Sequence, residues 1–443
     1  MSSRRGDRQR KRDDAGDGMS TAGKVALGVA AAAAGAAIGY IGSQLLSAWL
    51  NEPAEEKPDK EKPEKPKKCD PDESKSDKPT PPSKDDRVND KDAQRLAAVN
   101  GGIPATVPQM SLHEQLLHYY HEYVDIPGDR MQVVQALIGQ LTLALRHELR
   151  QSNSVKGLGL KVGDLVTFGS VAEGHQVIRP DSVDVMIPVM FGSQCRAQEA
   201  GDKLPGSFVI VVDNDSAATE VLCDEDRRLV TSKLLDILRA VVERVAEAMN
   251  EYQCTVEPVT AHDAMAVSLA VYGAGHDQVT VKFVPFVIID GHLFLPAHSA
   301  EQPDVVGRLW RESFVRQEKW SIDRFDASVC GHVVVLKVLK AIRLNHREQF
   351  GAVSSYHLKI ALFHVLEDLP DSGDWQQNAV GERLIDLLMK LTEVLSERCL
   401  PHYFEHNVNL LQEVPPETCN NLAKFIEKKL AHNDIACLLK RDY

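Results

Sequence analysis

The residues best suited to chemistry in this chain lie between positions 164 and 190. Gly169 and Ser170 follow the apolar run LVTF, where a Gly-Ser pair predicts a tight turn at the end of a strand. The N–H groups of such a turn and the serine hydroxyl can bind a phosphate. Ser182 and Asp184 lie two residues apart in the next strand, so their side chains face the same side. The segment therefore predicts a phosphate-binding turn beside a single carboxylate.

Acidic residues are scarce around that carboxylate. An enzyme that transfers nucleotides with two metal ions needs several carboxylates to hold them. Here Ser182 occupies one such position, and the later strand VTVKFVP carries Lys282 where another acid would stand. An ammonium group offsets phosphate charge but repels a divalent cation. We therefore predict a nucleotide cleft with no catalytic residue and no metal site, with an ordinary solvent-facing lysine as the alternative for Lys282.

Two other hypotheses stay open. The first is an active nucleotidyltransferase that uses Asp181, Asp184 and a third acid such as Asp290, although Asp181 faces away from Asp184 on a straight strand. The second is a scaffold whose cleft is empty. Ser-His-Asp chemistry is unsupported, because no G-x-S-x-G motif occurs. We interpret as structural the histidines of the amphipathic helices, His113, His118, His121, His357 and His364.

A lysine pair and a serine are expected to add phosphate contacts. Lys337 and Lys340 lie three residues apart in HVVVLKVLKAIRLN, so they share one face of a predicted helix. Cationic side chains suit phosphates, so Lys340 is the expected phosphate contact, with Lys337 and Lys282 as additional contacts. The alternative for Lys337 and Lys340 is a solvated helix face. Ser313, in LWRESFVR, offers a hydroxyl, but the sequence alone does not distinguish it from an ordinary helix residue.

Residues 109–443 carry the regular apolar periodicity of a folded domain. A capping box at Ser111 and Glu114 opens it. Strands are expected near 164–169, 183–191, 207–213, 254–259, 265–272 and 279–289, and helices near 130–151, 226–251, 328–346, 354–368, 380–398 and 416–431. The prediction is an α+β fold of two lobes, a mixed β-sheet and a helical C-terminal lobe, with a cleft between them.

The first 108 residues differ from this domain in composition. A short basic and polar tail, residues 1–23, precedes a predicted transmembrane helix at 24–50, which is long enough to cross a bilayer core of about 30 Å. Gly35 and Gly39 have the spacing with which two such helices pack into a homodimer. Residues 51–108 are rich in Pro, Lys, Glu and Asp, and predict a disordered linker. The basic tail places the N-terminus in the cytosol by the charge rule.

Charge and cysteine content narrow the function classes further. The formal net charge of -13 argues against a nucleic-acid partner. The eight cysteines are scattered and form neither a C-x-x-C pair nor a cluster with zinc spacing. We therefore expect reduced thiols in a reducing compartment and no disulfide framework.

The motifs GS, SVDVMIPV, VTVKFVP, LKVLKAI, SSYHLKIALFHVLE and LPHYFEHNVNLL follow one another within residues 109–440. Their order resembles the nucleotidyltransferase-related superfamily that includes cyclic GMP-AMP synthase. Within it, the anchor, the linker and MSLHEQLLHYY look most like the mitochondrial dynamics proteins. These are adaptors of the mitochondrial outer membrane, with the head in the cytosol, that recruit a dynamin-related GTPase for mitochondrial fission. The resemblance implies the same fold, membrane and partner, an orientation opposite to the charge rule, and a cleft that binds ADP or GDP without turnover.

The resemblance also assigns residues, with two departures. It places nucleotide contacts at Gly169, Ser170, Ser182, Ser313 and Lys340. Ser182 stands where a nucleotide-binding relative has histidine. An arginine two residues after the family's serine has no counterpart, since Val315 stands there and Arg316 follows. The family's basic GTPase-recruiting loop corresponds to the acidic segment VDNDSAATEVLCDEDRR, residues 212–228.

Overall fold

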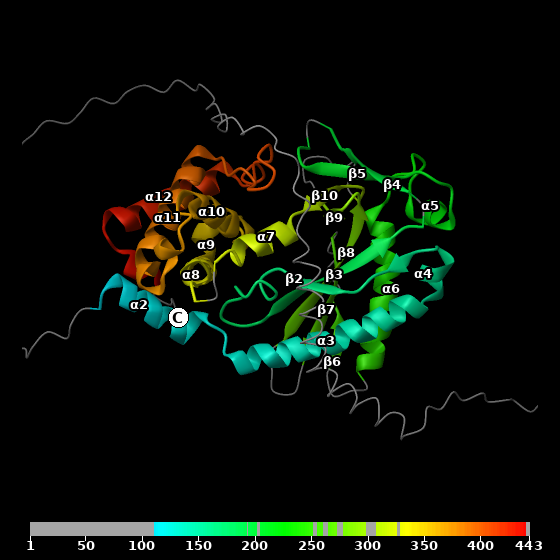
Figure 1. Cartoon of the computed structure of the whole chain (residues 1–443), viewed down its shortest axis with the longest axis horizontal. Helices are drawn as coiled ribbons and strands as arrows, with labels where there is room; N and C mark the ends of the chain where they lie inside the picture. The colour runs from blue at the N-terminus through cyan, green and yellow to red at the C-terminus, as the bar shows by residue number, and fades with distance from the viewer. Residues whose placement is uncertain are drawn as a thin grey trace, which may run out of the picture.

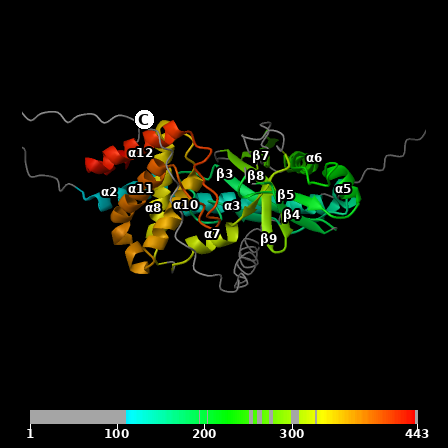
Figure 2. The same ribbon diagram turned by 90° about the horizontal axis from the view of Figure 1, so that it is seen from above.

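The computed structural model places the chain from residue 110 onward in two lobes that lie side by side (Figure 1, Figure 2). The described residues are 110–192, 194–201, 204–250, 255–259, 265–272, 278–297, 307–325 and 328–439. Within these ranges, every helix is too short or too polar to cross a membrane. The predicted tail, transmembrane helix and linker, residues 1–108, lie outside the described part of the chain.

One lobe is built on a mixed sheet of ten described strands. β3 (Ser182–Met190) and β8 (Val279–Ile289) run parallel at its centre, and the other described pairings are antiparallel. The strand order is β1-β3-β8-β9-β10-β5-β4. In addition, β2 pairs with β3, β7 pairs with β8, and β6 pairs with β7. The remaining bounds are β1 (Lys161–Val162), β2 (Val166–Phe168), β4 (Cys195–Glu199), β5 (Ser207–Val212), β6 (Thr255–Pro258), β7 (Val267–Tyr272), β9 (His292–Pro296) and β10 (Trp310–Ser313).

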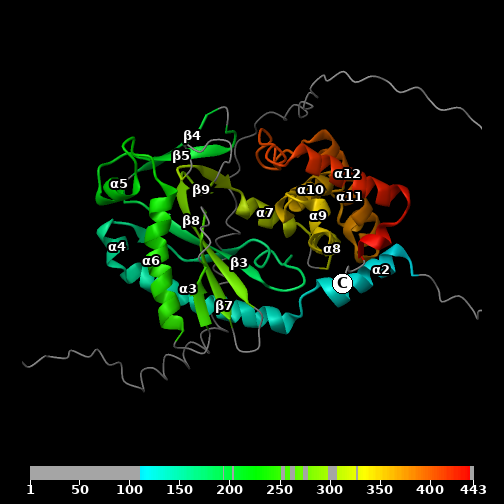
Figure 3. The same ribbon diagram turned by 180° about the vertical axis from the view of Figure 1, so that it is seen from behind.

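Two long helices, α3 (Gly128–Gln151) and α6 (Thr231–Met249), cover one face of this sheet (Figure 3). Their apolar residues recur at helical spacing and share a core with alternate strand residues such as Val183 and Val185. The intervening residues of β3 therefore face the opposite side. There Met186 packs against Val315 at the start of α7 (Val315–Ile322), the helix that leads into the second lobe.

The second lobe is helical and has its own core. α8 (Gly331–Asn345) is buried along most of its length, because other helices surround it. Those helices are α2 (Leu112–Tyr119) with the π-helical turn η1 (Tyr120–Val124), α9 (Arg347–Phe350), α10 (Ser355–Asp368), α11 (Val380–Glu397) and α12 (Pro416–Ala431). The predicted capping box opens α2: Ser111 N donates to Glu114 Oε2 at 2.7 Å, and Glu114 N donates to Ser111 Oγ at 3.2 Å. The α+β class with a mixed sheet and a helical lobe is thus confirmed.

Several predicted details are wrong. β4, β9 and β10 lie where no strand was expected, and α5 (Ala217–Leu222) and α7 are additional helices. Ser313 ends β10, so the helical interpretation of this residue fails. Short polar strands such as β10 form because neighbouring strands pair with them, which local pattern does not reveal. Cys223, Cys330, Cys419 and Cys437 are free thiols as expected, whereas Cys399 is disulfide-bonded. Sequence spacing does not show which thiols meet in the fold.

Gly331→Ala is expected to destabilise the helical lobe. Gly331 begins α8 against the main chain of Trp375, where an added Cβ would overlap the carbonyl oxygen and lie 3.0 Å from the carbonyl carbon. Backbone atoms in a packed lobe move only at a cost, so we expect the free energy of unfolding to fall by about 1–3 kcal/mol. Thermal unfolding followed by circular dichroism measures the change. Gly373→Ala, with no heavy atom within 4 Å of its Cβ, is the control, and equal Tm values would contradict the prediction.

Candidate functional site

The predicted phosphate-binding turn lies against the predicted carboxylate. Phe168, the last residue of β2, is the register partner of Asp184 on β3. Gly169 follows with φ +71°, and a Cβ there would lie 3.1 Å from Asp184 Oδ2. Glycine is therefore required both by the left-handed backbone and by the nearby carboxylate. Among the described residues, the N–H groups of Ser170, Val171 and Ala172 find no backbone acceptor, as in the first turn of a helix.

Asp184 has a lysine rather than a second acid beside it. In the parallel pair β3–β8, Asp184 is the register partner of Lys282, and Ser182 is the partner of Thr280. Lys282 thus stands on the face of the sheet where a two-metal site would need another carboxylate. Its side chain is half-buried. No group of three or more His, Cys, Asp or Glu side chains in the described ranges could hold a metal ion.

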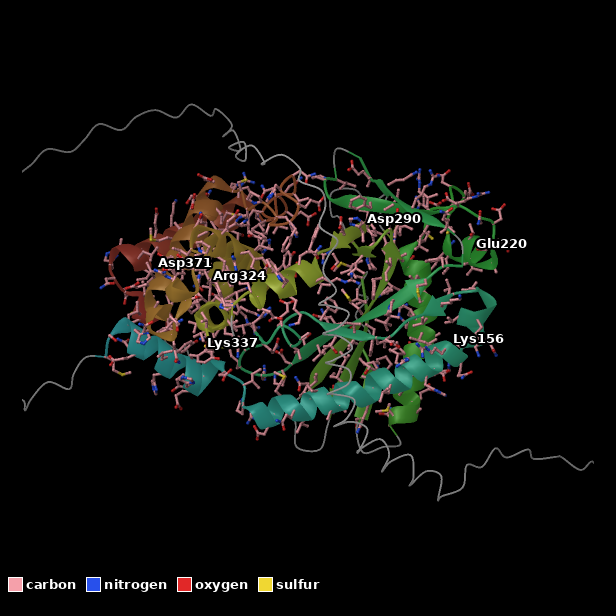
Figure 4. The ribbon with its side chains drawn as sticks, viewed as in Figure 1. Lys156, Glu220, Asp290, Arg324, Lys337 and Asp371 are labelled. Carbon is pink, nitrogen blue, oxygen red and sulfur yellow. The ribbon has the colours of Figure 1, made fainter. Side chains whose placement is uncertain are left out.

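The two other acids of the enzyme hypothesis do not reach Asp184. Asp290 lies in the turn after β8, with φ +50°, about 25 Å along the strand from Lys282 at a rise of about 3.3 Å per residue (Figure 4). Asp181 lies just before β3, where Gln176 Nε2 donates to its Oδ1 at 3.2 Å and Arg179 Nε lies 3.9 Å from its Oδ2. Of the three acids in the enzyme hypothesis, the structure therefore brings Asp184 alone to the turn.

The lysines of α8 are buried, so the solvated-face interpretation is wrong. Lys337 Nζ forms an ion pair of 2.5 Å with Asp125 and lies 5.4 Å from the centre of the Tyr120 ring. Lys340 Nζ donates to the carbonyl oxygen of His175 at 2.9 Å and lies 3.0 Å from its Nδ1. Of these two lysines, Lys340 bonds to the β2–β3 loop, residues 169–181, which carries Ser170. Burial lowers the pKa of Lys340 to about 8.

Glu173 and His175 on this loop begin a buried polar network that the sequence pattern did not indicate. Lys359 Nζ on α10 donates to Glu173 Oε2 at 3.0 Å and to Glu318 Oε2 on α7 at 2.6 Å. Glu173 Oε2 lies 2.7 Å from His175 Nε2. Tyr356 donates its hydroxyl to Glu318 Oε1 at 2.7 Å. Lys359 is therefore paired with two buried carboxylates, and the buried Lys340 lies nearby.

The partners of His175 determine its tautomer. A carboxylate beside Nε2 requires a hydrogen on that nitrogen, so Nδ1 is left to accept from Lys340. Burial, together with the charge of Lys340, lowers the pKa of His175, although the bond to Glu173 opposes this. Burial would raise the pKa of Glu173, but the hydrogen bond with His175 and the charge of Lys359 outweigh it and hold the pKa at about 2. At neutral pH the network therefore contains a neutral imidazole and a charged carboxylate.

Two of the sequence motifs on which the family resemblance rests contain residues of this network. SSYHLK contains Tyr356 and Lys359, and LPHYFEHNVNLL contains His402, whose Nε2 lies 2.8 Å from the Tyr356 hydroxyl. Two of the histidines interpreted as structural contact the main chain. His357 Nε2 meets the Leu410 carbonyl at 3.0 Å, and His364 Nε2 meets the Pro401 carbonyl at 2.9 Å.

Acid is expected to destabilise the protein through its buried histidines. Burial lowers the pKa of His402 to about 4 from 6.5, and it also lowers that of His175. Between pH 4 and pH 6.5 the unfolded chain therefore binds more protons than the folded chain. The free energy of unfolding is highest above about pH 6.5 and falls as the pH drops towards 4. We expect His402 alone to contribute about 1–3 kcal/mol of this loss. Urea unfolding at pH 7 and pH 4.5 measures it, and a loss that His402→Gln leaves unchanged would contradict this assignment.

The cavity at the turn is nearly closed. It has a volume of ≈ 10 Å³ and is lined by Gly169, Glu173, Met186, Val315 and others. That is room for about one water molecule, whereas small-molecule ligands need about 300 Å³ or more. Val315, at the position where the resemblance implies an arginine, lines this cavity. Ser313 lies two residues before it, at the end of β10.

The acidic segment, residues 212–228, lies at the edge of the sheet lobe, at the end of β5 and along α5. It borders a groove of ≈ 660 Å³. Basic residues pair with part of its charge: Arg227 with Asp215 at 2.8 Å, and Arg308 with Asp224 at 3.2 Å. Its surface is therefore acidic with interspersed arginines, unlike the basic loop that the resemblance implies.

Comparison with known proteins agrees with this architecture. Residues 332–428 match the family model of the Mab-21 protein HhH/H2TH-like domain. The mitochondrial dynamics protein MID51 of Danio rerio is 26% identical over 355 residues, which cover 75% of this chain and 73% of the relative. The mitochondrial dynamics protein MID49 of Xenopus laevis is 22% identical over 350 residues, which cover 75% and 71%. The chain is therefore similar to the mitochondrial dynamics proteins over about three quarters of its length, and most of its helical lobe resembles the Mab-21 domain.

Proposed function

We propose that this protein is a non-catalytic adaptor of mitochondrial fission. The observation that carries the proposal is Lys282 beside Asp184 on the central strands of the sheet. A cation at this position opposes the binding of two divalent ions, without which a nucleotidyltransferase does not activate its nucleophile. The names of the relatives, both mitochondrial dynamics proteins, support the cellular role.

The adaptor would be anchored in the mitochondrial outer membrane through residues 24–50, with residues 109–443 facing the cytosol. Its partner would be a dynamin-related GTPase, brought to the membrane by the head. The acidic groove at residues 212–228 is the candidate docking surface, with a complementary basic surface on the partner. Replacing the exposed Glu220 and Glu225 with lysine should then weaken capture of the GTPase by the full-length protein.

The cleft would bind a purine nucleoside diphosphate, ADP or GDP, without turning it over. The N–H groups of the Gly169-Ser170 turn, which have no backbone acceptor among the described residues, would meet a phosphate. Lys340 on α8, which contacts the adjoining β2–β3 loop, would add a positive charge. Ser182 and Ser313 would contribute hydroxyls, and Lys282 a further cation. Lys337 is a weaker candidate, because Asp125 already occupies its ammonium group.

Nucleotide binding predicts a stabilising shift that depends on Lys340. At a concentration 100 times the Kd, ADP or GDP should add about 2.7 kcal/mol to the stability of full-length protein. Lys340→Ala should abolish the shift, whereas Lys390→Ala, in a surface ion pair with Glu393, should retain it. Thermal unfolding with and without nucleotide measures this, and no shift with either nucleotide would favour an empty scaffold. Synthesis of cyclic dinucleotides or oligonucleotides with Mg²⁺ or Mn²⁺ would overturn the adaptor proposal.

A further inference from the structure

The buried network joins the two lobes. Glu173 and His175 belong to the β2–β3 loop, which leaves the sheet lobe. Lys340 and Lys359 belong to α8 and α10 of the helical lobe, and Glu318 to the helix α7 that connects the lobes. All five side chains are less than one-tenth exposed, so the contacts between lobes are made without water.

We propose that these five residues, the interlobe clamp, hold the cleft closed and set the distance between the lobes. The β2–β3 loop is attached to the helical lobe at two further points: Val177 packs in the helical core, and Ile178 N donates to Val124 O at 2.8 Å. Glu173 also lines the ≈ 10 Å³ cavity at the Gly169 turn. The same carboxylate therefore closes the cleft and binds Lys359. This inference does not depend on nucleotide binding.

The charges favour two discrete states rather than gradual opening. Lys359 alone compensates both Glu173 and Glu318, at 3.0 and 2.6 Å. If the β2–β3 loop withdrew slightly, it would leave buried charges unpaired, which costs several kcal/mol. Full withdrawal would let water solvate the same groups. The clamp should therefore be closed or open, with intermediate positions disfavoured.

The clamp has a pivot at the other side of the cleft. The β4–β5 turn touches the helical lobe at Gly206, where a Cβ would lie 2.6 Å from Val408 Cγ2 and 3.1 Å from Glu405 Oε2. This contact contains no member of the clamp. Release of the clamp should then widen the cleft at the Gly169 turn while the lobes stay in contact at Gly206. Ser170 moves with the loop, so the clamp also controls the predicted phosphate turn.

Distance measurement between the lobes tests the clamp. Spin labels carried by non-canonical residues would replace Lys156, on α4 (Asn153–Gly157), and Asp371, which lie at opposite ends of the molecule (Figure 4). Electron-spin resonance of the full-length protein should give a single narrow distance distribution. Lys359→Met should replace it with a broad or longer distribution. Lys390→Met removes a lysine whose partners, Glu393 and Asp368, lie in the helical lobe, and should leave the distribution narrow.

A second variant keeps the test decisive if Lys359→Met does not fold. Glu173→Gln/Glu318→Gln/Lys359→Met removes both carboxylates together with the lysine that pairs with them, while Lys340 keeps its bonds to His175, so this variant should fold. It should still give the broadened distribution, because the ionic contacts between lobes are gone. A folded triple variant with the narrow wild-type distribution would overturn the clamp and leave the network as core packing only. Measuring without nucleotide separates this outcome from failure of the nucleotide proposal.

Discussion

Replacement of Lys359 by methionine is expected to lower the free energy of unfolding by about 3–5 kcal/mol. Methionine fills a similar volume but provides no charge, so Glu173 and Glu318 remain buried as unpaired carboxylates. Tyr356 and His175 each retain a bond to one of them, which offsets only part of the cost. Urea unfolding of the full-length protein, followed by tryptophan fluorescence, measures the change at pH 7.

Two variants separate lost charge from lost packing. Glu173→Gln/Glu318→Gln/Lys359→Met should recover most of the stability, because both carboxylates are removed together with the lysine that pairs with them. Lys390→Met breaks a partly exposed ion pair and should cost less than about 1 kcal/mol. If Lys359→Met and Lys390→Met proved equally stable, the network would not be electrostatically coupled.

The part of the site that could be predicted from sequence is the part set by local pattern. The period of two in β3 places Ser182 and Asp184 on one face, and the Gly-Ser pair marks the end of β2. The alternation of residues in VTVKFVP likewise predicts which face of the sheet the side chain of Lys282 lies on in β8. The neighbouring position of Asp184 and Lys282 is confirmed by the strand register. These are short-range features, in which a residue and its neighbours decide the geometry.

The clamp could not be predicted in this way, because its partners are far apart in the chain. Lys359 and Glu173 are separated by 186 positions, and Lys340 and His175 by 165. A lysine at helical spacing has the same pattern whether it faces water or a buried acid. Lys340 is buried because the β2–β3 loop packs against the helical lobe. That packing is a tertiary contact, which the local sequence pattern does not show. The paired strands β9 and β10 were missed for the same reason.

The closed cleft and the absent second acid have different consequences for function. In the proposed function, Lys282 beside Asp184 opposes metal-dependent transfer, whatever the position of the lobes. The clamp instead decides whether anything larger than water enters. A protein with this cleft can lack catalysis and still change conformation. A change of conformation can alter the affinity of an adaptor for its partner.

Deletion of residues 24–50 is expected to abolish association with mitochondria. From residue 25 to residue 50 the segment has no charged side chain, and as a helix it spans more than the bilayer core of about 30 Å. The linker that follows is too polar to bind the hydrocarbon region by itself. Imaging of tagged full-length and deleted proteins, with alkaline extraction of isolated mitochondria, measures the loss.

The matched control replaces residues 24–50 with an unrelated apolar span of equal length. If the segment acts only as an anchor, the replacement should restore membrane insertion. It should restore mitochondrial targeting only if the targeting signal lies in the flanking residues. A second control replaces the linker, residues 51–108, with a Gly/Ser chain of the same length, which should leave the anchor in place. Deleted protein that stayed on mitochondria through alkaline extraction would require a second membrane attachment in the head. The proposed tethering by a single N-terminal helix would then be wrong.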